Sequence, residues 1–166
     1  MTDQNSTKQA VRIERVLNVP VEIVWQMWTQ PEHFQAWYGP SGATVVVAKM
    51  ELVLGGARLV SMEVTTPNGP MKMWFTGEHL EIVENQRLVY TEAMCDESGN
   101  VISPANMGMP ADHPTVTTIT VDLESLESGT KMVLVHSGIP EGSPGEAGWI
   151  MAFDKLVAYV KEKPQM

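Results

Sequence analysis

The sequence predicts an α+β fold in which a long C-terminal helix packs on a curved antiparallel sheet of about seven strands. Three observations lead to this prediction. One strand-like segment and two short helical segments open the chain. Six further β-rich segments follow, separated by turn residues, and a long amphipathic helix closes the chain. Antiparallel sheets that carry their helices on one side are typical of this class.

Composition favours one globular domain. The 166 residues suffice for a single core, and we expect residues 1–10 to form a mobile tail and residues 11–163 to form the domain. The net charge is −9 and the basic residues are scattered, so binding to nucleic acid or to an anionic membrane is not expected. No apolar run reaches the ~18 residues of a membrane span. A single cysteine, Cys95, and a polar N-terminus favour the cytoplasm.

The first strand and the first helix follow from a change of period. Residues 11–18 alternate between apolar and polar side chains, which predicts a strand. Pro20 suits the start of a helix. The segment 21–29 then places its valines and tryptophans at helical spacing, which predicts a short amphipathic helix.

A second short helix is expected directly afterwards. Thr29 and Glu32 are three residues apart, as in a capping box, and the helix would carry Phe34 and Trp37. Gly39 and the proline after it end the helical pattern.

The middle of the chain reads as an antiparallel meander. Its strand-like segments are rich in Val, Thr, Met and aromatic residues, and pairs such as Gly55-Gly56 and Ser128-Gly129 punctuate them. The predicted strands are 43–50, 56–65, 71–83, 87–95, 115–124 and 130–138. The connection 96–114 contains three prolines and has no period, so we expect it to be the most mobile internal segment and to exchange its amide protons fastest.

The last helix has clear start and stop signals. Ser143 is a good N-cap, Pro144 suits the first helical position, and Glu146 completes a capping box. Pro164 ends the helix. One apolar stripe is expected to face the sheet, formed by Trp149, Phe153, Leu156, Val157 and Val160.

This order of elements, with these residues, resembles a known superfamily. The matching segments begin with "RIERVLNVPVEIVWQMWTQPEHFQAWYGP" at 12–40, continue with "GGARLVSMEVTTPNG" at 55–69 and "FTGEHLEIVENQRLVYTE" at 75–92, and close with "GTKMVLVHSGIPEGSPGEAGWIMAFDKL" at 129–156. They resemble the SRPBCC or START-related superfamily with its helix-grip fold. The closest resemblance is to the stand-alone bacterial branch named after the activator of the heat-shock-protein-90 ATPase.

The resemblance implies a fold rather than one activity. Members include lipid and hormone carriers, polyketide cyclases and co-chaperone domains, and they share no universal catalytic residue. It also implies a cavity between the sheet and the long helix.

Aromatic residues near this cavity are the first candidates for ligand contact. Trp37, Tyr38, Trp149 and Phe153 are each either core or cavity wall. We expect Phe34 to be core, and Trp37 or Tyr38 to meet the cavity mouth with the Tyr38 hydroxyl turned towards solvent.

Further candidates lie on the strands. Met62, Met73 and Met132 suit either a flexible core or an adaptable apolar pocket, and Phe75 shares the phase of Met73. His79 and His136 would be core histidines, polar anchors for a ligand or general acids. Arg58 shares its strand phase with Met62 and would be a buried cation that needs a carboxylate or an anionic ligand.

Other chemistries lack a motif. No histidine pair has metal-ligand spacing, and no nucleophile elbow, P-loop or dinucleotide fingerprint is present, so no metal or cofactor is expected. The favoured function is binding of a small apolar or amphipathic molecule in the cavity. The alternatives are a co-chaperone-like module with a protein partner, and a cyclase- or hydrolase-type enzyme that uses a cavity histidine.

Overall fold

The computed structural model describes residues 10–103, 106 and 114–162. The tail expected at residues 1–10 lies outside this range except for Ala10, which begins the first strand. Of the connection 96–114 that is expected to be mobile, residues 104–105 and 107–113 also lie outside it. The mobility of both segments therefore stays a prediction.

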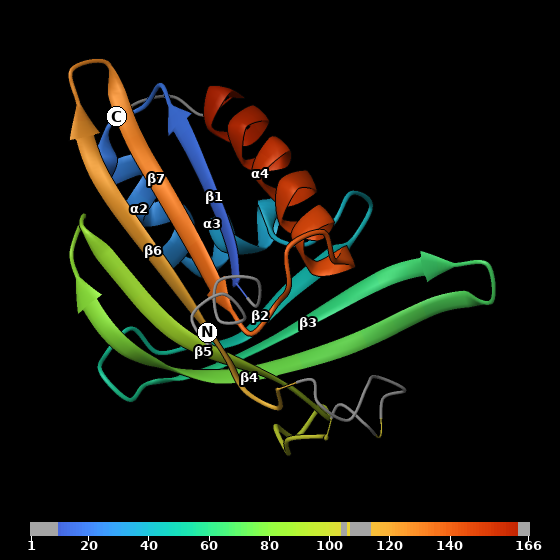
Figure 1. The fold of residues 1–166 in the computed structure, drawn as a ribbon. Helices are drawn as coiled ribbons and strands as arrows, with labels where there is room; N and C mark the ends of the chain where they lie inside the picture. The colour runs from blue at the N-terminus through green and yellow to red at the C-terminus, as the bar shows by residue number, and fades with distance from the viewer. Residues whose placement is uncertain (1–9, 104–105, 107–113, 163–166) are drawn as a thin grey trace, which may run out of the picture.

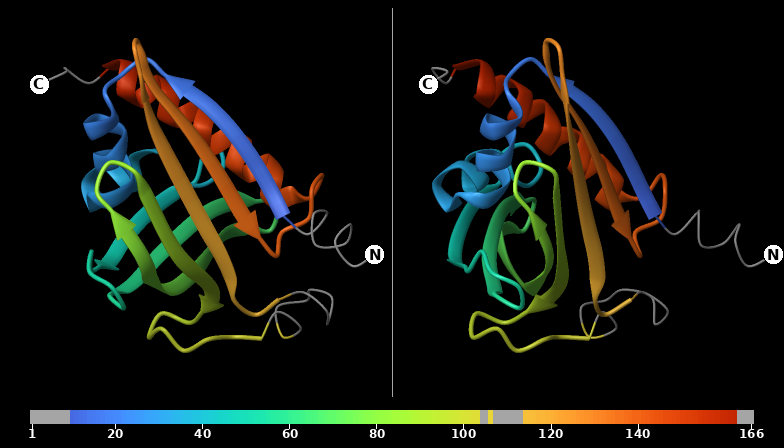
Figure 2. Two further views of the ribbon diagram at one scale, coloured as in Figure 1. Left: turned by 60° about the vertical axis from the view of Figure 1, so that its left-hand side comes forward. Right: turned by 90° about the vertical axis from the view of Figure 1, so that its left-hand side faces the viewer.

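The described strands form one antiparallel sheet that curves around the rest of the molecule (Figures 1 and 2). The order of the strands across the sheet is β1-β7-β6-β5-β4-β3-β2, so the first strand pairs with the last and all other neighbours are consecutive. The strands are β1 (Ala10–Leu17), β2 (Thr44–Met50), β3 (Ala57–Thr66), β4 (Gly69–Val83), β5 (Arg87–Cys95), β6 (Thr117–Leu126) and β7 (Gly129–Ser137).

Three helices lie on the inner side of this sheet. The short helices α2 (Val21–Thr29) and α3 (Pro31–Trp37) follow β1, and the long helix α4 (Pro144–Glu162) crosses the concave face (Figure 1). The hairpin of β3 and β4 extends past the N-terminal end of α4. This is the α+β helix-grip architecture that the sequence predicts, with two short helices after the first strand.

One predicted cap is wrong. The Thr29 hydroxyl donates to the Trp25 carbonyl at 2.8 Å, four residues back in α2, and does not cap α3. Gln30 is the N-cap of α3, with an extended backbone and no capping bond from its side chain. Thr29 fails as a cap because it is still helical, so its hydroxyl faces the carbonyl of the preceding turn.

The cap of α4 forms with one change. The Ser143 hydroxyl accepts from the Glu146 amide at 3.4 Å, as a capping box requires. The Glu146 carboxylate, however, reaches the amide of Gly142 at 2.6 Å, one residue before the cap. The start of the long helix is thus fixed on both sides of Ser143.

Aromatic side chains fill the core where α2, α3 and α4 meet. The ring of Trp28 lies 4.8 Å from that of Trp37 and 6.2 Å from that of Phe153, both edge-on. Its indole N–H donates to the sulfur of Met132 at 3.3 Å. Phe34 is fully buried beside these rings, as expected. Large aromatic side chains therefore fill this end of the core, whereas the N-terminal end of α4 borders a cavity.

Candidate functional site

A cavity of about 680 Å³ opens between the N-terminal half of α4 and the sheet. Its walls come from β3, β4, β5, the start of β6 and the end of β7 on one side, and from the N-terminal half of α4 on the other. The connection from α3 to β2 forms part of the rim with Gly39 and Pro40. Segments from both ends of the chain therefore build one site.

Small residues on α4 create this space. Gly145, Gly148 and Ala152 all face the cavity and contribute almost no side-chain volume. A Cβ atom added at Gly148 would meet no atom within 4 Å, so this position opens directly into the cavity. Gly145 is more constrained, because a Cβ there would lie 2.8 Å from Cγ2 of Ile139.

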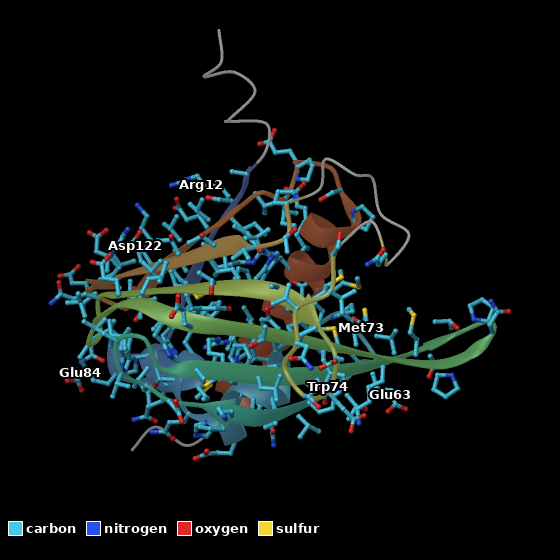
Figure 3. All side chains as sticks on the ribbon, turned by 90° about the horizontal axis from the view of Figure 1, so that it is seen from below. Arg12, Glu63, Met73, Trp74, Glu84 and Asp122 are labelled. Carbon is cyan, nitrogen blue, oxygen red and sulfur yellow. The ribbon has the colours of Figure 1, made fainter. Side chains whose placement is uncertain are left out.

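The sheet side of the cavity is apolar and rich in methionine. Met62 on β3 and Met73 and Phe75 on β4 line it, and Met94 joins them from β5. Met62 and Met73 are direct partners in the register of β3 and β4. Because side chains alternate along a strand, Met73 and Trp74, both labelled in Figure 3, face opposite sides of the sheet. Unbranched thioethers adapt to ligands of different shape.

One carboxylate interrupts the apolar wall. Glu92 on β5 is half-buried and lines the cavity, and its Oε2 accepts a hydrogen bond from the Tyr38 hydroxyl at 2.9 Å. Burial raises the pKa of Glu92, while the Tyr38 bond and the charge of Arg58 act in the opposite direction. Burial, followed by the charge of Glu92, raises the pKa of Tyr38 well above its usual value. Tyr38 stays a neutral donor at all physiological pH values.

Tyr38 is held at this place from two directions. It is the C-cap residue of α3, and its amide bonds to the Phe34 carbonyl at 3.1 Å. The Lys155 ammonium of α4 donates to the carbonyls of Tyr38 and Pro40 at 3.2 and 3.1 Å. The end of α3 is thereby tied to α4 at the cavity rim.

A buried cation lies behind the carboxylate. The guanidinium carbon of Arg58 sits 3.6 Å from the centre of the Tyr90 ring and 5.2 Å from that of Phe34. One guanidinium nitrogen lies 3.4 Å from Nε2 of His79. No ion pair of Arg58 is found among the described residues, although its charge acts on Glu92. Two aromatic rings and a distant carboxylate thus replace the salt bridge that the sequence suggested.

His79 belongs to this interior and not to the cavity. It is 1% exposed, and its Nδ1 has no hydrogen-bond partner in the described part of the chain. Burial, then the charge of Arg58, lowers its pKa, so the ring is neutral. A neutral imidazole without access to the cavity cannot exchange a proton with a bound molecule.

His136 does line the cavity, within a chain of hydrogen bonds. The Trp149 indole N–H, which can only donate, lies 2.9 Å from Nδ1 of His136. Nδ1 must therefore be the acceptor, which places the ring proton on Nε2, 2.8 Å from the Thr117 hydroxyl. That hydroxyl donates in turn to the Glu92 carbonyl at 3.3 Å. Both ring nitrogens of His136 are therefore engaged, Nδ1 by the Trp149 indole and Nε2 by the Thr117 hydroxyl.

The structure brings some predicted ligand-binding residues together and separates others. Six line the cavity: Tyr38, Met62, Met73, Phe75, His136 and Trp149. Five do not: Trp37, Arg58, His79, Met132 and Phe153. That any of them contacts a ligand stays a prediction.

The residues outside the cavity have clear structural partners. Trp37 is fully buried and donates its indole N–H to the Met27 carbonyl at 3.0 Å. Met132 accepts from Trp28, and Phe153 packs between the tryptophans. Of the pair expected at the cavity mouth, Tyr38 is there and Trp37 is not. The Tyr38 hydroxyl bonds to Glu92, so the expectation that it faces solvent is wrong.

Sequence reasoning missed Glu92, and a signal was present. Glu92 alternates with the buried residues Leu88 and Tyr90 on β5, which places it on the inner face. Arg58 was expected to be an inward-facing cation that needs an acidic neighbour. A search for an acidic residue on the inward-facing positions of a neighbouring segment, as a partner for Arg58, would have identified Glu92.

Two other site classes find no support in the described residues. Within them, no group of three or more His, Cys, Asp or Glu side chains is placed to hold a metal ion. None of the helices in the same ranges combines the length and the apolar character needed to cross a bilayer.

Comparisons with known proteins agree with this architecture. Residues 18–161 match the model of the family described as activator of Hsp90 ATPase homolog 1-like protein. A crystal structure of a Chromobacterium violaceum protein is 26% identical, with a TM-score of 0.75 over 93% of this chain and 99% of that one. A solution structure from Arthrobacter aurescens is 23% identical, with a TM-score of 0.77 over 96% and 90%. No curated protein matches the chain.

Proposed function

The chain belongs to the family of activator of Hsp90 ATPase homolog 1-like proteins, and from that premise we propose that it binds one small apolar or amphipathic molecule in the cavity beneath α4. The observation that carries the proposal is the combination of volume and lining. At about 680 Å³ the cavity falls within the range of about 300–1,000 Å³ that small-molecule sites occupy. Its wall is almost entirely apolar, with a few polar groups at fixed positions.

The cost of keeping such a space supports the proposal. An unfilled apolar cavity lowers stability, because the surrounding side chains lose contacts that a packed core would make. The same helix fills its other half with large side chains, so this chain is able to pack the space. Gly148, in particular, is a poor helix former at a position that would accept a side chain.

A protein-interaction role is the second candidate function. The β2–β3 loop exposes Val53 and Leu54 at 61% and 70%, and Leu80 on the neighbouring strand is 48% exposed. Backbone bonds hold the loop in place, with Gly55 donating to the His79 carbonyl at 2.8 Å. Exposed apolar side chains on an ordered loop favour contact with a protein partner.

Filling the cavity tests the ligand-binding proposal. Gly148→Leu adds a side chain into the open space, and Ala147→Leu adds the same side chain at an exposed position of the same helix. We expect Gly148→Leu to weaken binding of the uncharged dye Nile red by at least about tenfold, and Ala147→Leu to leave it unchanged. Loss of a Gly from the helix should keep or raise stability by about 0.5–1 kcal/mol.

The measurement is dye fluorescence during titration, with native mass spectrometry of the purified protein to detect a bound small molecule. Gly148→Ala is a further control, because it removes the glycine and adds only one methyl group. Equal dye affinity in wild type and Gly148→Leu would contradict the proposal, since the dye would then bind elsewhere.

A further inference from the structure

Among the residues that the structure describes, the cavity wall carries a negative group and no positive one. Among its lining residues, the ionisable side chains are Tyr38, Glu92 and His136, and neither Lys nor Arg is present. Tyr38 is neutral, and both ring nitrogens of His136 are engaged by Trp149 and Thr117. Glu92 is therefore the only group in this set that can carry charge towards a bound molecule.

Glu92 has an unused acceptor. Oε2 accepts from Tyr38, whereas Oε1 accepts no hydrogen bond from the described residues. The half-buried carboxylate lines a mainly apolar space, where a second donor must come from water or from a ligand. A charged donor would form a strong bond there, because charge-assisted bonds are about twice as strong as neutral ones.

Arg58 cannot bind a negatively charged group of a ligand in the cavity. Its guanidinium is stacked on the Tyr90 ring and next to His79, behind the wall, and it does not line the cavity. Burial raises the pKa of Glu92, and the charge of Arg58 acts against that rise. This buried cation thus supports a carboxylate at the wall instead of offering a positive charge to a ligand.

Aromatic rings flank the same place. The rings of Tyr38 and Trp149 both line the cavity and meet edge-on, with centres 5.4 Å apart. Aromatic faces attract ammonium groups, most strongly where water is excluded. A carboxylate beside two aromatic rings is a combination that suits a cation.

We infer that the molecule bound beneath α4 is an amphipathic amine, with its apolar body against the methionine wall and its ammonium group on Glu92. The inference rests on the proposed ligand-binding function and names the ligand class. A fatty acid would place a second carboxylate beside Glu92, with no Lys or Arg among the described lining residues to balance it, so anionic amphiphiles are disfavoured. The net charge of −9 adds a weaker, general attraction for cations.

Three ligands of equal chain length test the inference: decylamine, decanol and decanoate, each below its aggregation concentration. Displacement of Nile red gives their affinities. We expect wild type to bind decylamine at least about tenfold more tightly than decanol, the equivalent of one charge-assisted bond, and decanoate most weakly. Glu92→Gln should bring decylamine and decanol to within about threefold of each other.

Two variants separate this site from general effects. Glu63 lies on β3 next to Met62 but is exposed, so Glu63→Gln removes the same charge without touching the cavity, and it should keep the amine preference (Figure 3). Tyr38→Phe removes one donor to Glu92 but keeps the carboxylate, so it should reduce that preference less than Glu92→Gln does. A similar loss in Tyr38→Phe and Glu92→Gln would show disturbed packing instead and overturn the inference.

The outcomes distinguish the two proposals. If decanol and decanoate bind and decylamine has no advantage, the amine inference is wrong and the cavity function stands. If the amine preference disappears in Glu63→Gln as well, it reflects overall charge and the inference is wrong. If no ligand competes with Nile red, both proposals fall.

Discussion

The two halves of α4 cover the same sheet, but one half packs against a filled core and the other borders a cavity. The C-terminal half presents Phe153, Leu156 and Val160, which are all buried among the aromatic residues of α2 and α3. The N-terminal half presents Gly145, Gly148 and Ala152, and a cavity of about 680 Å³ lies beneath it. The backbone is one continuous helix, so side-chain volume makes the difference. We expect the packed half to contribute most of the stability, and the hollow half contains the cavity of the proposed ligand site.

The largest expected effect comes from the packed half. Phe153 is fully buried between Trp37 and Trp149, with ring centres 6.0 and 5.5 Å away. Phe153→Ala should lower the free energy of unfolding by about 3–5 kcal/mol, since it creates a cavity where the neighbours cannot collapse. Urea unfolding measures this change.

Met73→Ala is the matching substitution in the hollow half. Met73 is only half-buried and borders space that is already empty, so its loss should cost less than about 1.5 kcal/mol. The comparison fails if Phe153→Ala costs under about 1 kcal/mol, or if both substitutions cost the same.

The second effect is smaller and depends on pH. Because burial raises the pKa of Glu92 in the folded state, the folded protein holds this proton more tightly than the unfolded chain does. The contribution of Glu92 is therefore most favourable below its unfolded pKa, and it is lost as pH rises through the folded value. Glu92→Gln removes this dependence, so the variant should be more stable than wild type at pH 7.

Unfolding curves between pH 4 and pH 8 check the sign. The advantage of Glu92→Gln should shrink towards acid and vanish near the unfolded pKa of about 4.3. Glu63→Gln, exposed on β3, should show almost no change at any pH. A Glu92→Gln variant that is less stable than wild type at pH 7 would mean that the carboxylate stabilises the fold.

The sequence predicts the two regions unequally. The strands and α4 follow from periodicity, because the alternation on β6 and β7 and the stripe on α4 reflect burial on one face. Periodicity does not separate core from cavity wall, since both positions face inward and both are apolar. For this reason the sequence pattern does not distinguish Trp37 and Phe153, which are core, from Tyr38 and Trp149, which line the cavity. The cavity results from small residues such as Gly148. These residues do not form a periodic pattern in the sequence, so periodicity does not reveal the cavity.

The polar residues illustrate the same limit. The strand phase of Arg58 and His136 predicts that they face inward, and both are buried. The partners of these two residues lie on other strands and on α4. Which residues become partners depends on the register of the strands and on the distance between the sheet and the helices. The contacts of Arg58 with Tyr90 and of His136 with Trp149 therefore require the folded structure.

The smallest expected effect again concerns the packed half, at a polar contact. The Tyr159 hydroxyl lies 2.8 Å from Nδ1 of His33, with the rings edge-on, and this contact joins α4 to α3. Tyr159→Phe should lower the free energy of unfolding by about 1 kcal/mol, the usual net worth of one hydrogen bond. Nile red binding should not change, because neither residue lines the cavity. A double-mutant cycle with His33→Ala isolates the pair. A coupling energy near zero, or a change in dye affinity, would show that α3 and α4 are joined differently.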